Sequence, residues 1–137
     1  MRVSRRDLML MCAAVDRTFT YGGGRLGTWV GKCIHCRRKL GLDADGTSQG
    51  TATLEHITPR THGGTNTLDN LAIACARCNT QKGRKLDILP LKDARLQNVI
   101  RILTERRLAR LRPIGDHGCP RLSTMIQRGV FFEKGTI

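Results

Sequence analysis

The chain has 137 residues, which suits one modest hydrophobic core with short extensions and argues against several independent domains. Lys and Arg number 24 against 11 Asp and Glu, so the formal charge is +13 and a polyanion such as nucleic acid is the simplest partner; a basic protein without such a partner is the alternative. Aromatic residues make up only 4% of the chain, which argues against stacked aromatic platforms for single-stranded nucleic acid.

The sequence contains no run of about 18 apolar residues, so we expect no membrane span. Basic residues before an apolar run at the N-terminus superficially resemble a signal peptide, but Asp7 and Asp16 interrupt or close that run and no convincing cleavage site follows. We therefore expect a cytoplasmic protein, in which six cysteines favour metal binding over disulfides.

The N-terminal part, residues 1–30, predicts a helical extension. Ser4 followed by Asp7 is typical of a helix start, and the helix should end before the glycines at 22–24. Its apolar stripe consists of Leu8, Met11, Cys12, Val15 and Phe19.

Strand, loop and helix signals then alternate through residues 31–90. A short strand is expected at residues 28–32, and the Gly, Asp, Thr and Ser composition of 41–50 predicts a turn or exposed loop. The β-branched stretch 51–57 and the apolar stretch 69–75 predict two strands joined by a loop. Residues 76–85 predict a short helix.

The C-terminal part, residues 91–137, predicts one amphipathic helix over 92–112 and a tail that periodicity does not assign. The other face of that helix is rich in arginine and is either simply solvated or turned toward phosphates. The expected organisation is thus an N-terminal extension (1–30), a central domain (31–90) and a basic C-terminal helix with tail (91–137).

Two C-x-x-C pairs, Cys33/Cys36 and Cys75/Cys78, can place four thiolates around one ion. Residues 37–74 lie between the pairs, which exceeds the spacing of simple zinc ribbons and implies that a folded piece is inserted there. Four protein ligands close the site, so this predicts a structural Zn²⁺ on which folding depends. Four free buried cysteines or a thiol redox pair are the alternatives.

The remaining pattern lies between and around the cysteine pairs. The stretch L-E-H-I-T-P-R-T-H-G-G-T-N-T-L-D-N-L-A-I-A-C-A-R-C-N-T-Q-K, together with the upstream C-x-x-C, resembles the HNH endonuclease family. The resemblance covers about residues 31–85. It implies an α+β fold with a small ββα-metal core, stapled by the four-cysteine zinc site and flanked by N- and C-terminal helices.

The resemblance also implies roles for individual residues. His56 is similar to the general base, Glu55 to the acidic metal ligand where the family usually has Asp, and Asn79 to the last metal ligand. Asn70 is similar to the middle residue that holds the hairpin and orients the histidine. His62 lies in the same loop, whereas Asp116-His117 repeats the acid–histidine pair without its context.

This set of residues suits phosphodiester hydrolysis. A histidine can take a proton from water near neutral pH, and a hard cation bound by Glu55 and Asn79 can stabilise the phosphate and the departing oxygen. Oxygen ligands favour Mg²⁺ or Mn²⁺, whereas the thiolates favour zinc. Adjacent strand residues point to opposite faces, so Glu55 and His56 can share one site only at a strand end or bend.

The expected activity is therefore metal-dependent DNA cleavage, with double-stranded DNA as the partner and nicking as the simplest outcome for one site. The alternative is a non-catalytic zinc-containing DNA-binding module derived from a nuclease. Four basic residues are expected to meet phosphates near the site: Arg60, Arg77, Lys82 and Arg84.

Overall fold

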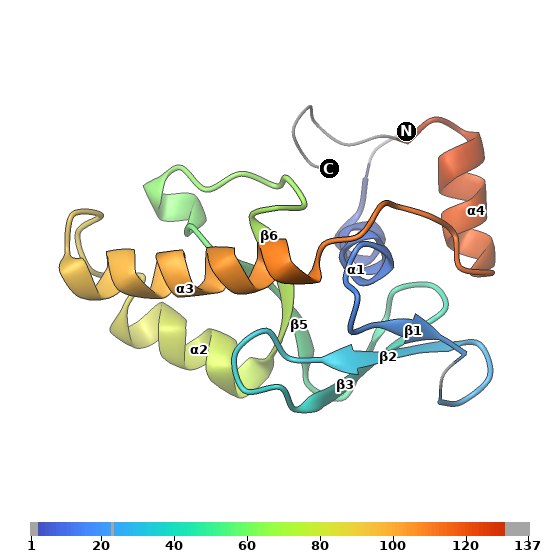
Figure 1. Ribbon diagram of the computed structural model, residues 1–137, viewed down its shortest axis with the longest axis horizontal. Coiled ribbons are helices and arrows are strands. Elements are labelled where there is room, and N and C mark those ends of the chain that lie inside the picture. The colour runs from blue at the N-terminus through green and yellow to red at the C-terminus, as the bar shows by residue number, and fades with distance from the viewer. Residues whose placement is uncertain (1–2, 23, 131–137) are drawn as a thin grey trace.

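A β-hairpin and the helix that follows it form the centre of the fold (Figure 1). The computed structural model describes residues 3–22 and 24–130. Strand β5 (Ala52–His56) pairs antiparallel with β6 (Leu71–Cys75), and α2 (Ala76–Lys85) begins directly after β6. The Cys75 side chain caps that helix by accepting a hydrogen bond from a backbone N–H in its first turn. The predicted strand–strand–helix order and the α+β class are confirmed.

A second antiparallel sheet lies beside this unit. Its strands follow one another in the order β1 (Thr20–Tyr21), β2 (Thr28–Lys32), β3 (Lys39–Asp43) and β4 (Ser48–Gln49). The predicted strand at 28–32 is thus confirmed as β2. The turn between β2 and β3 carries the first cysteine pair.

The prediction of a turn or exposed loop over residues 41–50 was wrong in part. β3 extends to Asp43 and β4 covers Ser48–Gln49, so only the turn between them matches the expectation. Leu40 and Leu42 alternate with exposed neighbours and bury one face of β3, while β2 supplies its hydrogen bonds. These strands are short and lie in a polar segment, so the alternation of buried and exposed residues was too brief to predict a strand.

The N-terminal helix α1 (Arg5–Ala14) begins with a capping box in which Ser4 and Asp7 bond each other's backbone N–H. The helix ends earlier than the apolar spacing suggested, because the chain turns at Asp16, whose carboxylate accepts a hydrogen bond from Thr18 N. The helix packs against β5 and β6. Its buried side thus covers the hairpin.

The long helix α3 (Ala94–Arg110) lies alongside α2 (Figure 1) and is capped by Asp93. Its range confirms the helix expected at 92–112, but several of its basic residues point inward. Arg107 is fully buried, where its guanidinium lies 3.4 Å from the Asp16 carboxylate and donates to the carbonyl of Leu68. A buried charge needs such partners, so Arg107 is neither solvated nor free for phosphates.

Two further α3 arginines bind the turn that follows β2. Arg106 Nη1 donates to the carbonyls of Ile34 and His35, at 3.3 and 3.2 Å. Arg110 donates to the carbonyls of Lys32 and Cys33, at 2.9 and 3.2 Å. Helix α3 therefore fixes the backbone around the first cysteine pair.

The tail contains a helix that the sequence did not predict. α4 (Pro120–Gln127) begins with Pro in its first turn and buries Leu122 and Met125. The last part of the unassigned tail, residues 131–137, lies outside the described residues.

One cluster of buried side chains extends from Met9 to Met125 and draws on all three predicted segments. The division at residues 30 and 90 stays a prediction. Within the part of the chain that the structure describes, no helix combines the length and apolar character needed to cross a membrane.

Candidate metal centre and active site

The two cysteine pairs meet in space as the spacing predicted. Cys33 directly follows β2 and Cys36 lies in the next turn, while Cys75 ends β6 and Cys78 lies in the first turn of α2. Their four sulfur atoms lie within 4.8 Å of one another. The cysteines are thus positioned to bind one metal ion, consistent with a zinc knuckle.

Hydrogen bonds and burial distribute charge unevenly over this cluster. The backbone hydrogen bond from Arg38 lowers the pKa of Cys36 to about 7, whereas burial and the neighbouring sulfurs raise the pKa of Cys78 well above its usual range. The Cys33 sulfur accepts hydrogen bonds from the backbone N–H groups of His35 and Cys75. Four thiolates at this spacing repel one another, so the arrangement fits a bound cation that compensates their charge.

Glu55 is the most deeply buried acid near these cysteines. Its side chain is 1% exposed, and Oε1 accepts a hydrogen bond of 2.5 Å from His35 Nε2. Its second oxygen, Oε2, has no hydrogen-bond partner among the described residues. A buried carboxylate oxygen without a partner is costly, and a cation ligated there would satisfy it.

Asn79 lies on α2, on the side of the helix that faces β5. Its Nδ2 donates to Thr53 Oγ1 at 3.0 Å and to the Leu54 carbonyl at 3.2 Å. Both bonds use the amide nitrogen, so Oδ1 is the atom with which Asn79 could bind a cation. Thr53 and Glu55 are two apart and share one face of the strand, which places Asn79 on the same side of the hairpin as Glu55.

His56 is the last residue of β5 and is partly exposed. Its Nε2 lies 2.7 Å from Asn66 Oδ1. An amide oxygen can only accept, so Nε2 is the donor in this pair, which leaves Nδ1 as the acceptor of the neutral ring. The expected position at a strand end is thus observed, and Asn66 is a partner that the sequence reasoning missed.

Asn70 ties the loop after β5 to the start of β6. Its Oδ1 accepts from Thr58 N at 2.8 Å, and its Nδ2 donates to the carbonyls of Thr58 and Thr65. Each of these bonds goes to loop backbone, and the bond to the His56 ring comes from Asn66 instead. Asn70 therefore acts on His56 through the shape of the loop.

The region that holds these residues matches a known family. The sequence model of the HNH endonucleases matches residues 33–85. This stretch is an HNH domain. No curated protein and no solved structure matches the chain.

The loop of the HNH domain contains a glycine that no larger residue can replace without a shift in the backbone. A Cβ atom at Gly64 would lie 1.8 Å from the Thr58 carbonyl oxygen. The loop closes through the bond from Gly64 N to the Pro59 carbonyl. This close approach joins the two ends of the turn that follows His56.

We expect Gly64→Ala to open this turn, to lower the free energy of unfolding by about 1–3 kcal/mol and to impair any activity that needs His56. Gly83 on α2 is the matched control, because a Cβ there meets nothing within 4 Å. Chemical denaturation of both variants checks this, with Gly83→Ala expected to be neutral or stabilising. Equal losses in the two variants would contradict the close approach.

The structure corrects the prediction for Lys82. Its side chain is buried, and Nζ donates to the His56 carbonyl at 3.1 Å and to Asp87 Oδ1 at 2.8 Å. The ammonium therefore holds the end of β5 against α2 and is not presented to a phosphate. Three other predicted contacts are exposed: Arg60, Arg77 and Arg84.

Two further histidines of the HNH domain, His62 and His35, form defined hydrogen bonds. His62 Nε2 lies 3.1 Å from the Asp87 carbonyl, which links the loop to the end of α2. His35 lies inside the first C-x-x-C pair and binds Glu55, a contact that was not predicted from the sequence. A histidine at that position was the only signal, and the sequence alone does not say which way its ring turns.

Proposed function

We propose that this protein is a metal-dependent endonuclease that hydrolyses phosphodiester bonds of double-stranded DNA. The observation that carries the proposal is the buried, unpartnered oxygen of Glu55 inside the HNH domain, next to a histidine at the strand end. The match to an endonuclease family and the formal charge of +13 support it.

In this proposal His56 is the general base. Its Nδ1 takes a proton from water, while the bond from Nε2 to Asn66 fixes the tautomer and the ring orientation. The water oxygen then forms a bond to phosphorus as the bond to the 3′ oxygen breaks. The products are a 5′-phosphate and a 3′-hydroxyl.

Glu55 and Asn79 fit a divalent cation because both offer oxygen atoms on the same side of the hairpin. Mg²⁺ or Mn²⁺ bound there supplies compensation for the negative charge on the phosphate and the leaving oxygen. The four cysteines offer only sulfur and fit Zn²⁺ with a structural role. His56 lies at the end of β5, so a phosphodiester that crosses this strand end can meet both sides of the hairpin.

His35 is a positioning residue in this scheme, since it holds Glu55 through a single hydrogen bond. We expect His35→Ala to weaken Mn²⁺ binding and to slow cleavage by about 10- to 100-fold. The backbone N–H of His35 still binds the Cys33 sulfur in this variant, so the zinc content should stay at the wild-type level.

Electron paramagnetic resonance of free Mn²⁺ measures the affinity, and elemental analysis measures zinc. Glu55→Gln is the reference, because it removes the carboxylate itself and should lose more affinity than His35→Ala. Unchanged Mn²⁺ affinity in His35→Ala would contradict the positioning role.

Incubation of supercoiled plasmid with Mg²⁺, with Mn²⁺ and with chelator tests the proposed activity. We expect conversion to the relaxed form, because one active site cuts one strand, and no conversion in chelator. A linear product would indicate double-strand cutting. Absence of cutting with every divalent cation, in zinc-loaded protein that binds DNA, would instead favour a DNA-binding module derived from a nuclease.

A further inference from the structure

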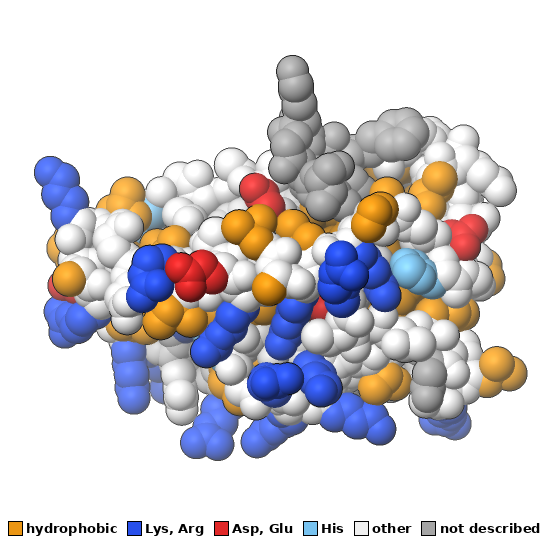
Figure 2. All heavy atoms as spheres, in the orientation of Figure 1, with side chains coloured by type: hydrophobic (Ala, Val, Ile, Leu, Met, Phe, Trp, Pro, Cys, Tyr) orange, Lys and Arg blue, Asp and Glu red, His pale blue; other side chains and the backbone are white. Residues whose placement is uncertain are grey.

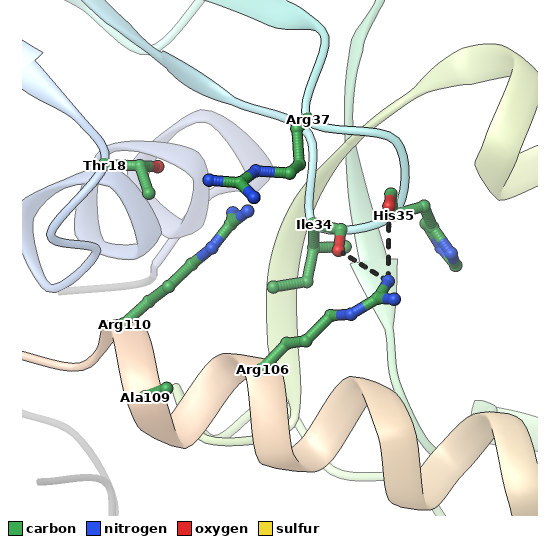
Figure 3. A pocket seen from close by; sticks show the side chains of 7 residues that line it. All are labelled: Thr18, Ile34, His35, Arg37, Arg106, Ala109 and Arg110. Carbon is green, nitrogen blue, oxygen red and sulfur yellow. Dashed lines mark hydrogen bonds between the residues drawn. The ribbon is translucent and has the colours of Figure 1, made fainter.

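We propose that a cavity between the first cysteine turn and α3 binds a backbone phosphate of the nucleic acid, beside the catalytic site. This inference rests on the proposed function for its ligand. The cavity has a volume of about 360 Å³ and is shown in Figure 3. Its lining comprises Thr18, Ile34, His35, Arg37, Arg106, Ala109 and Arg110.

Three guanidinium groups converge on this cavity from two elements. Arg37 comes from the cysteine turn, and Arg106 and Arg110 come from α3 (Figure 3). The side chains of Arg37 and Arg110 extend toward each other across it.

The positive charge in the cavity is only partly compensated. None of the described residues that line it is acidic. Arg106 and Arg110 bond neutral carbonyls, and the carboxylate of Asp16, 3.7 Å from Arg110, also pairs with the buried Arg107. Guanidinium groups bind phosphate oxygens through charge-assisted hydrogen bonds, so an anion of this class fits the cavity.

The backbone of Arg37 gives a second, independent indication. Its φ is 67°, a conformation that is uncommon for any residue with a side chain and that glycine adopts without strain. The turn itself closes through the backbone, since Arg37 N donates to the Cys33 carbonyl. The fold would therefore favour glycine here, and the long cationic side chain needs another reason.

The cavity adjoins the proposed active site through His35, which lines the cavity and also bonds Glu55. The backbone carbonyl of His35 faces Arg106 on the cavity side, whereas its ring turns away and binds Glu55 (Figure 3). A phosphate held here would belong to the same DNA backbone that Glu55 and His56 engage. On the face drawn in Figure 2, Lys and Arg side chains spread over α3 and the region below it, so a duplex meets further positive charge on either side.

A matched pair of variants tests the site. Arg37→Gln removes a cavity charge, and Arg38→Gln removes an exposed charge one residue away that does not line the cavity. We expect Arg37→Gln to weaken binding of a short fluorescein-labelled duplex about tenfold. The slope of the logarithm of the affinity against the logarithm of the salt concentration should decrease in magnitude by about 1. Arg38→Gln should change affinity less than about twofold.

Fluorescence anisotropy without divalent cation, over a range of salt concentrations, makes this measurement. Arg37→Gly is the second variant: it relieves the backbone, so it should raise or keep the thermal midpoint and still lose affinity. Equal weakening by Arg37→Gln and Arg38→Gln would overturn the site, as would full affinity in Arg37→Gly. If Arg37→Gln weakens DNA binding but the wild-type protein does not cut plasmid under any condition, the phosphate site would stand and the proposed nuclease activity would be rejected.

Discussion

Replacing His56 with alanine is expected to lower the rate of plasmid cleavage by about 10²- to 10⁴-fold, the range that a general base contributes. The loss should appear in kcat, because in the proposed mechanism His56 acts on water and makes no other contact with the substrate. Zinc content and thermal midpoint should stay near the wild-type values, since the ring is partly exposed and Asn66 is its one hydrogen-bond partner within residues 3–22 and 24–130. Asn66→Ala should cost less, about tenfold, because it frees the ring without removing the base.

His117→Asn is the matched control, since Asp116-His117 repeats the acid–histidine pair. His117 has a φ of 51°, which asparagine tolerates, and its ring packs edge-on against Trp29 while Nε2 bonds the Ala14 carbonyl. Its role is structural, so cleavage by this variant should match the wild type. Single-turnover cleavage by His56→Ala, Asn66→Ala and His117→Asn measures the difference. Full activity in His56→Ala would refute the role of His56 as general base.

Replacing Cys36 with serine is expected to abolish stoichiometric zinc binding and to lower the thermal midpoint by tens of degrees or prevent folding. The scale follows from the apparent binding free energy of structural zinc, about 10–16 kcal/mol in small domains. A metal ion bound by the four cysteines would join the turn after β2 to the end of β6 and the start of α2, so without it the hairpin would lose this link to the β1–β4 sheet.

Cys119→Ser separates this effect from simple burial. Cys119 is fully buried and Cys36 is exposed, so loss of packing alone would make the Cys119 variant the worse one. Serine at 119 can still donate to the Ala44 carbonyl that the thiol bonds, and we expect a cost of about 1 kcal/mol with one zinc per chain retained. Elemental analysis of zinc and thermal denaturation show which of the two variants, Cys36→Ser or Cys119→Ser, is the more destabilised.

Local signals account for what could be predicted from the sequence. The apolar strands and the two C-x-x-C pairs predicted the hairpin, α2 and the metal cluster, because each rests on neighbouring residues or on ligand spacing. Ser4 and Asp93 each cap the helix expected nearby, since a cap needs only the next few residues. The match over residues 33–85 agrees with the family recognised from these motifs.

Contacts between distant segments could not be predicted in this way. The bond from His35 to Glu55 joins residues 20 apart, and the ion pair of Arg107 with Asp16 joins residues 91 apart. Lys82 looked like a surface cation because its burial depends on how α2 meets the end of β5. The same holds for the α3 arginines, whose inward direction follows from the carbonyls that surround them.

The bonds from Arg106 and Arg110 to the first cysteine turn bear on how this HNH domain could be moved between proteins. The recognisable motif ends at residue 85, yet the donors that hold its first cysteine pair come from residues 106 and 110. A graft cut at the motif boundary would carry all four thiols with Asn66, Asn70 and Asn79, but the backbone carbonyls of Cys33, Ile34 and His35 would lose their arginine donors. The smallest transferable unit therefore includes α3, and a host protein would have to accept that helix with the hairpin.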